Sequence, residues 1–241
     1  MPKFLRSIMT LLGGLVLILS FSSNSTFAKN VETEDLDSQT YSQIQDYSRK
    51  ALSDTQTKDK IKKEIERFGG EEKAKKIHNK TQVEYNNLSK EDKKLYLLSN
   101  ILVEKEVKNN QIKNPNLNRR SESRSGDNYG CWTTDGWVMY RNIWGQVGVK
   151  FTVTAYSCGE QTYMTSGKIL NSRGEVYFPG WGYYGEAGNG YQYITSSQFV
   201  GYRQGVFKSC MSTNWSCIQE LRPWVELHTT PFNSTDYFYG A

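Results

Sequence analysis

The sequence predicts an α+β chain organised by segment, with an N-terminal charged helical region followed by a small antiparallel β-sandwich or barrel domain with two disulfides. Two observations predict this division. All four cysteines and all six tryptophans lie between Cys131 and Ala241. The hydrophobic pattern also changes there, from the 3.6-residue period of helices to the two-residue alternation of strands. We therefore divide the chain into residues 1–28, 29–110, 111–128 and 129–241.

Residues 1–28 have the pattern of a secretory signal peptide. Lys3 and Arg6 precede an apolar run from Ser7 to Phe21, and small residues end the segment at Ala28. The apolar run is about 15 residues long, shorter than the ~20 that a membrane-spanning helix needs. The sequence thus predicts cleavage after Ala28 and a secreted, extracellular chain with no transmembrane segment.

Four cysteines in an exported chain most simply form two disulfides. Among the three pairings that are open, spacing favours Cys131–Cys158 and Cys210–Cys217, because each pair is centred on a turn and its members would face each other across a hairpin. The sequence has no C-x-x-C pair and only two histidines. We therefore expect no metal site and no cofactor.

Residues 29–110 predict a helical pro-region or spacer. Asp54 or Thr57 caps one helix, which ends at Gly69-Gly70, and a further helix continues from Glu71 to about Tyr85. Ser89 caps a last helix that runs to about Lys108. The apolar stripes on these helices are narrow. The sequence therefore predicts a loose bundle, or helices that dock on something else.

Residues 111–128 predict a flexible linker, because they contain almost no apolar side chains. Arg119, Arg120 and Arg124 lie in this linker, where basic residues are readily cut by proteases. A plain linker and the end of a cleavable propeptide are both open interpretations.

The clearest strand signal in the chain follows the linker. Val149, Phe151, Val153 and Ala155 alternate with polar residues, and Gly136–Tyr140 is the expected hairpin partner. A turn is predicted at residues 171–174, and residues 180–193 are expected to form a loop rich in glycine and aromatic residues. Short strands with turns between them are typical of a sandwich or barrel.

Charge argues against a nucleic-acid partner. The chain carries a formal net charge of +5. Residues 125–241, however, hold 7 Lys and Arg against 8 Asp and Glu, which is −1, so the basic excess lies within residues 1–124. The β-domain has no basic stripe of the kind that binds phosphates.

The aromatic residues of the 180–193 loop are the strongest indication of a binding site. Flat, amphipathic rings on a loop suit sugar faces, peptides or a membrane interface. The alternative is a loop folded back over the edge of the sheet. The candidate ligand-binding residues are Trp181, Tyr183, Tyr184, Tyr191 and Tyr193.

Glu226 and His228 share one face of a predicted strand and are the weak candidates for general acid–base chemistry. A surface polar pair is the alternative, because no motif places a nucleophile beside them. We therefore expect a non-enzymatic effector, antimicrobial or toxin-like, that acts on a cell-surface component, a membrane interface or a polysaccharide. A secreted carbohydrate- or cell-wall-binding module is the first alternative, a small secreted hydrolase the second, and an inhibitor of a secreted enzyme also stays open.

Overall fold

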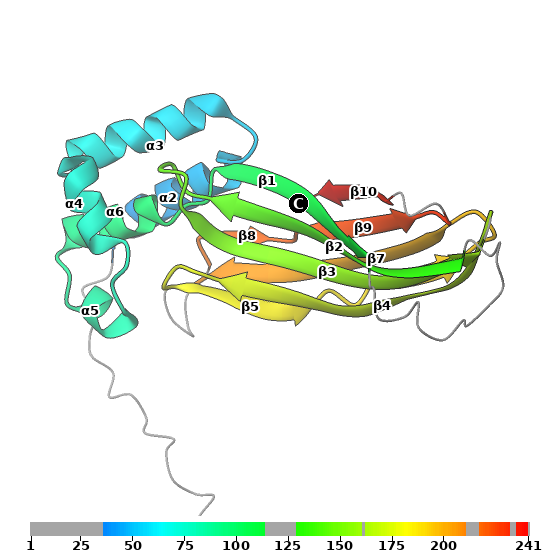
Figure 1. The fold of residues 1–241 in the computed structure, drawn as a ribbon. Helices are drawn as coiled ribbons and strands as arrows, with labels where there is room; N and C mark the ends of the chain where they lie inside the picture. Colours follow the sequence, from blue (N-terminus) through cyan, green and yellow to red (C-terminus); the bar gives the residue numbers. More distant parts are fainter. Residues whose placement is uncertain (1–35, 114–128, 161, 211–216, 232–234, 241) are drawn as a thin grey trace, which may run out of the picture. The chain divides into compact units, whose positions relative to one another are not determined.

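The computed structural model describes residues 36–113, 129–160, 162–210, 217–231 and 235–240. The predicted signal peptide and most of the predicted linker lie outside these residues. Residues 35–241 form one compact unit, in which helices precede antiparallel sheets (Figure 1). The described helices are α2 (Ser38–Lys50), α3 (Thr55–Arg67), α4 (Gly70–Ile77), α5 (Gln82–Asn86) and α6 (Lys90–Ser99). None of them is long and apolar enough to cross a membrane.

Side-chain caps set where the helices begin. Asp54 accepts a hydrogen bond from the Gln56 amide at the start of α3, and Ser89 accepts one from the Asp92 amide at the start of α6. Ser89 was predicted as a cap, and Asp54 was one of the two residues predicted for the start of α3. The helix expected from Glu71 to Tyr85 is instead two helices, because Thr81 and Glu84 form a capping box that starts α5.

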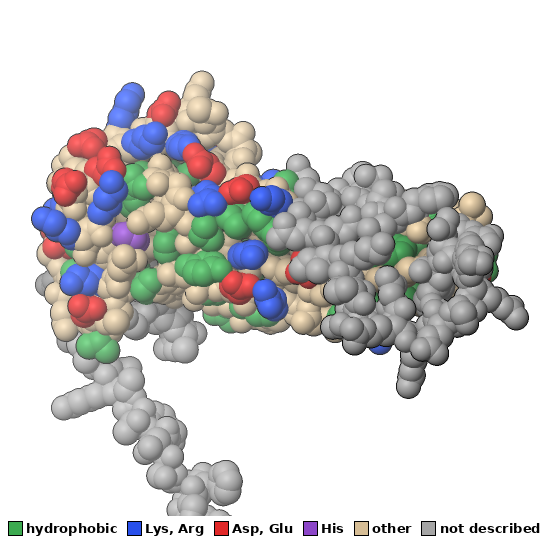
Figure 2. Space-filling model, in the orientation of Figure 1, with side chains coloured by type: hydrophobic (Ala, Val, Ile, Leu, Met, Phe, Trp, Pro, Cys, Tyr) green, Lys and Arg blue, Asp and Glu red, His purple; other side chains and the backbone are tan. Residues whose placement is uncertain are grey.

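The helices enclose an apolar core of their own. Leu95, Leu97 and Leu98 of α6 are fully buried, and they pack with Ile61 and Ile65 of α3. Lys and Arg side chains are interspersed with Asp and Glu over the outer surface of the helices (Figure 2). The narrow apolar stripes of these helices are enough to enclose a core, because one helix, α6, lies at the centre and is covered by its neighbours.

The strands form two antiparallel sheets. One has the order β1-β2-β3-β4, and the other has the order β10-β9-β7-β5, with β6 and β8 also paired to β7 (Figure 1). The strands are β1 (Glu104–Lys113), β2 (Tyr129–Arg141), β3 (Val147–Glu160), β4 (Tyr163–Val176), β5 (Trp181–Glu186), β6 (Tyr191–Ile194), β7 (Phe199–Ser209), β8 (Gln219–Leu221), β9 (Trp224–Thr229) and β10 (Thr235–Gly240).

The two sheets pack face to face as an open sandwich, not as a closed barrel. The predicted alternation in β3 is confirmed, since Val149, Phe151 and Val153 are fully buried between the sheets. Gly136 of β2 shows how close the layers are, because a Cβ there would lie 2.6 Å from Leu227 Cδ2 of β9. The domain core therefore depends on small residues facing large ones across the two sheets.

Both predicted disulfides are present. Cys131–Cys158 joins directly opposed residues of β2 and β3, and Cys210–Cys217 joins the end of β7 to the segment leading into β8. No cysteine in the chain is free. The pairing chosen from spacing is confirmed, and Cys131 and Cys158 lie directly opposite one another, as antiparallel neighbours do.

Three predictions about secondary structure were wrong: a helix end, a turn and a loop. The last helix ends at Ser99, and Glu104–Lys113 forms β1, an edge strand paired with β2 along its whole length. The turn predicted at residues 171–174 lies inside the single strand β4. Gly174 is there for packing, since it lies against the ring of Tyr183. The loop predicted at residues 180–193 contains β5 and β6.

The helices dock on one end of the sandwich through buried polar contacts. The Gln219 side chain accepts from the Leu102 amide at 3.0 Å and donates to the carbonyls of Leu102 and Ser48 at 3.1 and 3.3 Å. The Trp181 indole donates to the Asn100 carbonyl at 3.1 Å. This interface confirms that the helices dock on another part of the molecule, and Leu102 belongs to the sandwich core.

Candidate functional site

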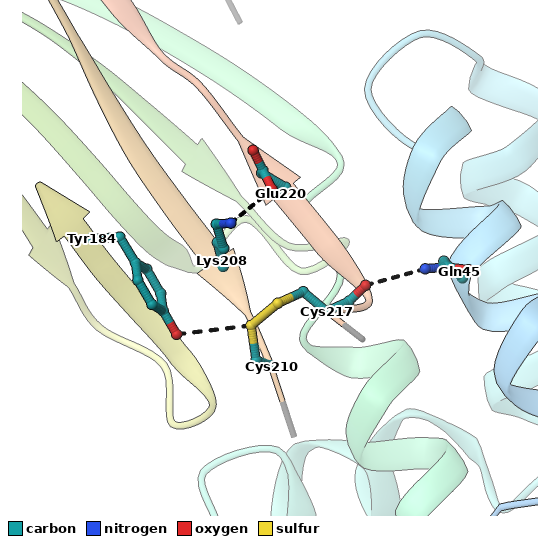
Figure 3. The surroundings of a disulfide bond; sticks show 6 residues. All are labelled: Gln45, Tyr184, Lys208, Cys210, Cys217 and Glu220. Atoms are coloured by element: carbon teal, nitrogen blue, oxygen red, sulfur yellow. Dashed lines mark hydrogen bonds and ion pairs between the residues drawn. A yellow bond between two sulfur atoms is a disulfide. The ribbon is translucent and has the colours of Figure 1, made fainter. Parts of the chain in front are cut away.

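The five predicted ligand-binding residues fall into two groups, of which the first lies on β5. Trp181 and Tyr183 point toward the interior: Trp181 is only 7% exposed, and Tyr183 packs against Phe207 at 5.0 Å between ring centroids. Tyr184, the next residue along β5, is 61% exposed and lies near Cys210 (Figure 3). Burial therefore removes Trp181 from the candidate surface.

Tyr191 and Tyr193 lie on β6, where both rings are exposed on the outer face of the second sheet. The register places Tyr191 opposite Tyr202 of β7, and Tyr202 opposite Glu226 of β9. Two residues further along β6, Tyr193 lies in the same cross-strand row as His228 of β9. The structure thus brings the predicted aromatic residues and the predicted Glu/His pair onto one surface.

We call this surface the aromatic face and define it by Tyr191, Tyr193, Tyr202, Trp224, Glu226 and His228. Neighbouring rings of this face are stacked with a lateral offset. The Tyr191 and Tyr202 rings are 4.9 Å apart and nearly parallel, Tyr193 lies 6.3 Å beyond Tyr191, and Trp224 lies 5.8 Å from Tyr202. Such offset stacking is a favourable aromatic geometry. It leaves ring edges and the outermost parts of the rings to meet a ligand.

A carboxylate lies in the middle of the aromatic face. The Tyr191 hydroxyl donates to Glu226 Oε2, and His228 Nε2 lies 2.5 Å from Glu226 Oε1. The hydrogen bond to Glu226 raises the pKa of Tyr191 to about 12, so the phenol keeps its proton at neutral pH. Both oxygens of Glu226 therefore have a protein partner, and the face carries a negative charge when His228 is neutral.

Backbone and side-chain contacts hold β6 in place. Arg203 Nη1 donates to the Tyr191 carbonyl at 3.2 Å, and the Ile169 amide of β4 donates to Gln192 Oε1 at 2.9 Å. The second contact links β6 to the opposite sheet. The tyrosines are therefore presented on a paired strand, which positions them more firmly than a loop would.

Glycoside hydrolysis needs a second carboxylate at a set distance from the first. The aromatic face contains Glu226, and the register places Asp236 of β10 opposite His228. Within the described residues, no three His, Cys, Asp or Glu side chains gather where they could hold a metal ion. The face lies on the outer side of the second sheet, where Tyr191 and Tyr193 are exposed and the side chains of Glu226 and His228 are 18% and 22% exposed.

Sequence reasoning did not identify Tyr202 or Trp224 as site residues. The alternation of β7 could have identified Tyr202, because Phe199 and Phe207 are fully buried and Tyr202 lies an odd number of positions from each. The cross-strand stacking of Tyr191 on Tyr202 requires the register of β6 on β7, which no local pattern encodes.

No family model, no curated protein and no solved structure matches this chain.

Proposed function

We propose that this chain is a secreted, non-enzymatic effector that attaches to polysaccharide of a cell surface through the aromatic face. The observation that carries the proposal is the row of stacked, exposed rings beside the Tyr191–Glu226–His228 hydrogen bonds. Tyrosine offers an apolar ring and a polar hydroxyl together. That combination matches a sugar, which has apolar C–H faces and hydroxyl groups around its edge.

The charge of the aromatic face supports a polysaccharide over a membrane. Burying the Glu226 carboxylate against an apolar bilayer would be costly, and anionic lipid headgroups would be repelled by it. A neutral glycan can instead donate hydroxyl groups to the carboxylate. The two disulfides and the predicted signal peptide support an extracellular site of action.

In this proposal the helical region is a cap that stays attached to the sandwich. It shares a buried interface with the sandwich and supplies β1 to the first sheet. Processing between β1 and β2 would leave these contacts in place. The proposal extends to an antimicrobial or toxin-like effect on the bound cell, with the helical region as the pro-region of the effector.

Co-sedimentation with insoluble cellulose, chitin and peptidoglycan tests the proposal. Tyr191→Ala and Tyr193→Ala should each weaken retention by roughly 5- to 30-fold, the range of about 1–2 kcal/mol for an aromatic contact. Tyr177→Ala is the matched control. Tyr177 is 50% exposed, as Tyr193 is, and its hydroxyl bonds to Glu175 just as that of Tyr191 bonds to Glu226, but it lies outside the aromatic face.

Two outcomes would contradict the proposal. Retention that is unchanged in both aromatic-face variants would remove the site, and equal loss in the Tyr177→Ala control would show a non-specific effect. Release of soluble sugar by the wild type, abolished in Glu226→Gln, would identify the hydrolase alternative instead.

A further inference from the structure

A groove lies away from the aromatic face, between the helices and the sandwich. It has a volume of about 690 Å³ and is bounded by the C-terminal half of α2, the start of β1 and the strand β8. β8 and β9 share one edge of β7, β8 along Phe207–Ser209 and β9 along Phe199–Gln204. The groove beside β8 and the aromatic face beside β9 are therefore on different halves of the sheet.

Three apolar residues form the floor of the groove. Leu52, just after α2, is partly buried against the sandwich core, while Ile218 and Leu221 are buried, with 2% and 5% of each residue exposed. In the wall, the Ser48 hydroxyl donates to the Ile218 carbonyl, and the Gln219 amide donates to the Ser48 carbonyl. The lining as a whole presents polar and apolar surface in similar amounts.

Cations lie around the groove, and they come from three different elements. Arg49 belongs to α2, Lys105 to β1, and Arg222 to the corner after β8. Against these three positive charges the lining has one carboxylate, Glu220, which pairs with Arg222 at 2.7 Å and with Lys208 at 3.2 Å. Arg49 pairs with exposed Asp46 at 3.3 Å, a surface contact of little strength that an anion can replace.

The disulfide holds one wall of the groove in position. Cys217 lines the groove, its carbonyl accepts a hydrogen bond from Gln45 of α2 at 3.3 Å, and its sulfur is tied to Cys210 at the end of β7 (Figure 3). Because β8 has only three residues, this link and the α2 contacts fix it. The groove is therefore a built feature of the fold and not a chance gap between side chains.

We infer that the groove binds an anionic amphiphile, with a phosphate or carboxylate head at Arg49, Lys105 and Arg222 and a short apolar chain over Leu52, Ile218 and Leu221. Arginine and lysine are the side chains that bind such anions. Removing an apolar chain from water is favourable at about 25 cal/mol per Å² of buried surface. The volume of the groove lies in the range of sites for small ligands.

Isothermal titration of the full-length mature chain tests the inference with soluble probes. Dihexanoylphosphatidylglycerol should bind. Glycerol phosphate, which has the head without the chains, and dihexanoylphosphatidylcholine, which has the chains with a zwitterionic head, should bind much more weakly. If glycerol phosphate binds as tightly as the lipid, the apolar floor is not used and the inference fails. If the phosphatidylcholine binds as tightly, the cations are not used and it also fails.

Variants separate this site from the rest of the surface. The double variant Arg49→Gln and Arg222→Gln should bind phosphatidylglycerol roughly 30-fold more weakly, since each cation contributes about a factor of five. Arg173→Gln is the matched control, because Arg173 is as exposed as Arg222 and pairs with a glutamate two residues away in the same manner. Binding that survives in the double variant, or that falls equally in the control, would overturn the inference.

Two further measurements identify the source of the ligand and keep the sites apart. Binding to phosphatidylcholine vesicles only when they contain phosphatidylglycerol would assign the head to a membrane lipid. Binding of the soluble lipid without vesicle binding would assign it to a free amphiphile, and both results support the groove. Tyr193→Ala should leave lipid binding unchanged, because the aromatic face is separate from the groove, and a loss there would count against the inference.

Discussion

Replacing Trp181 with alanine should destabilise the protein strongly, although the sequence places this residue among the candidate contacts. Its ring lies in the sandwich core, with only 7% of the residue exposed. Its indole nitrogen donates to the Asn100 carbonyl, just after α6. Trp181 therefore joins the helices to the sandwich as well as filling the core.

The size of the effect is set by these contacts. A buried tryptophan removed to alanine costs about 3–5 kcal/mol in transfer and cavity energy. Leaving the buried Asn100 carbonyl without its donor adds about 1–3 kcal/mol. We expect a loss of at least about 4 kcal/mol, which is a large part of the ~5–15 kcal/mol by which proteins are stable. Trp181→Phe, which keeps an aromatic ring but removes the donor, should lose less of the free energy of unfolding.

Urea unfolding of the protein, followed by circular dichroism and by intrinsic fluorescence, measures the loss. Tyr184→Ala is the control, because Tyr184 is on the same strand and 61% exposed, and its free energy of unfolding should change by less than ~0.5 kcal/mol. A change below about 1 kcal/mol for Trp181→Ala would refute the burial of Trp181 and return it to the surface candidates.

Three other predictions concern a buried histidine, the spacing of the sheets and the linker. Burial lowers the pKa of His78 below its ordinary value, so stability should fall as the pH drops below about 6.5, by at most about 1.4 kcal/mol per pH unit, and His78→Phe should flatten this dependence in thermal melts at pH 5 to 8. Gly136→Ala should cost about 1–3 kcal/mol in urea unfolding, since its Cβ would meet Leu227, and an unchanged midpoint would contradict the close sheet packing. Limited trypsin digestion should cut first at Arg119, Arg120 or Arg124, and the two fragments should elute together in gel filtration because β1 stays paired with β2; separate elution would show that this pairing does not hold them.

The sequence by itself determined the features that depend on near neighbours. Asp54 and Ser89 were identified as caps because a cap bonds to an amide two or three residues along. Cys131–Cys158 and the alternation around Phe151 were identified because a hairpin and a two-sided strand leave regular spacing in the chain. These signals are local, and so they are present before the chain folds.

The tertiary structure decided the features that depend on a distant partner. Glu104–Lys113 is rich in charge, and its first half was assigned to a helix and its last residues to the linker, yet it forms β1 because β2 offers a free edge to pair with. Trp181 and Tyr191 were both predicted as ligand-binding residues, but the pairing of β5 and β6 to β7 buries the first and exposes the second. The same pairing places Tyr191 against Glu226, 35 residues later in the chain, and register between strands is fixed by the packed core and not by either strand alone.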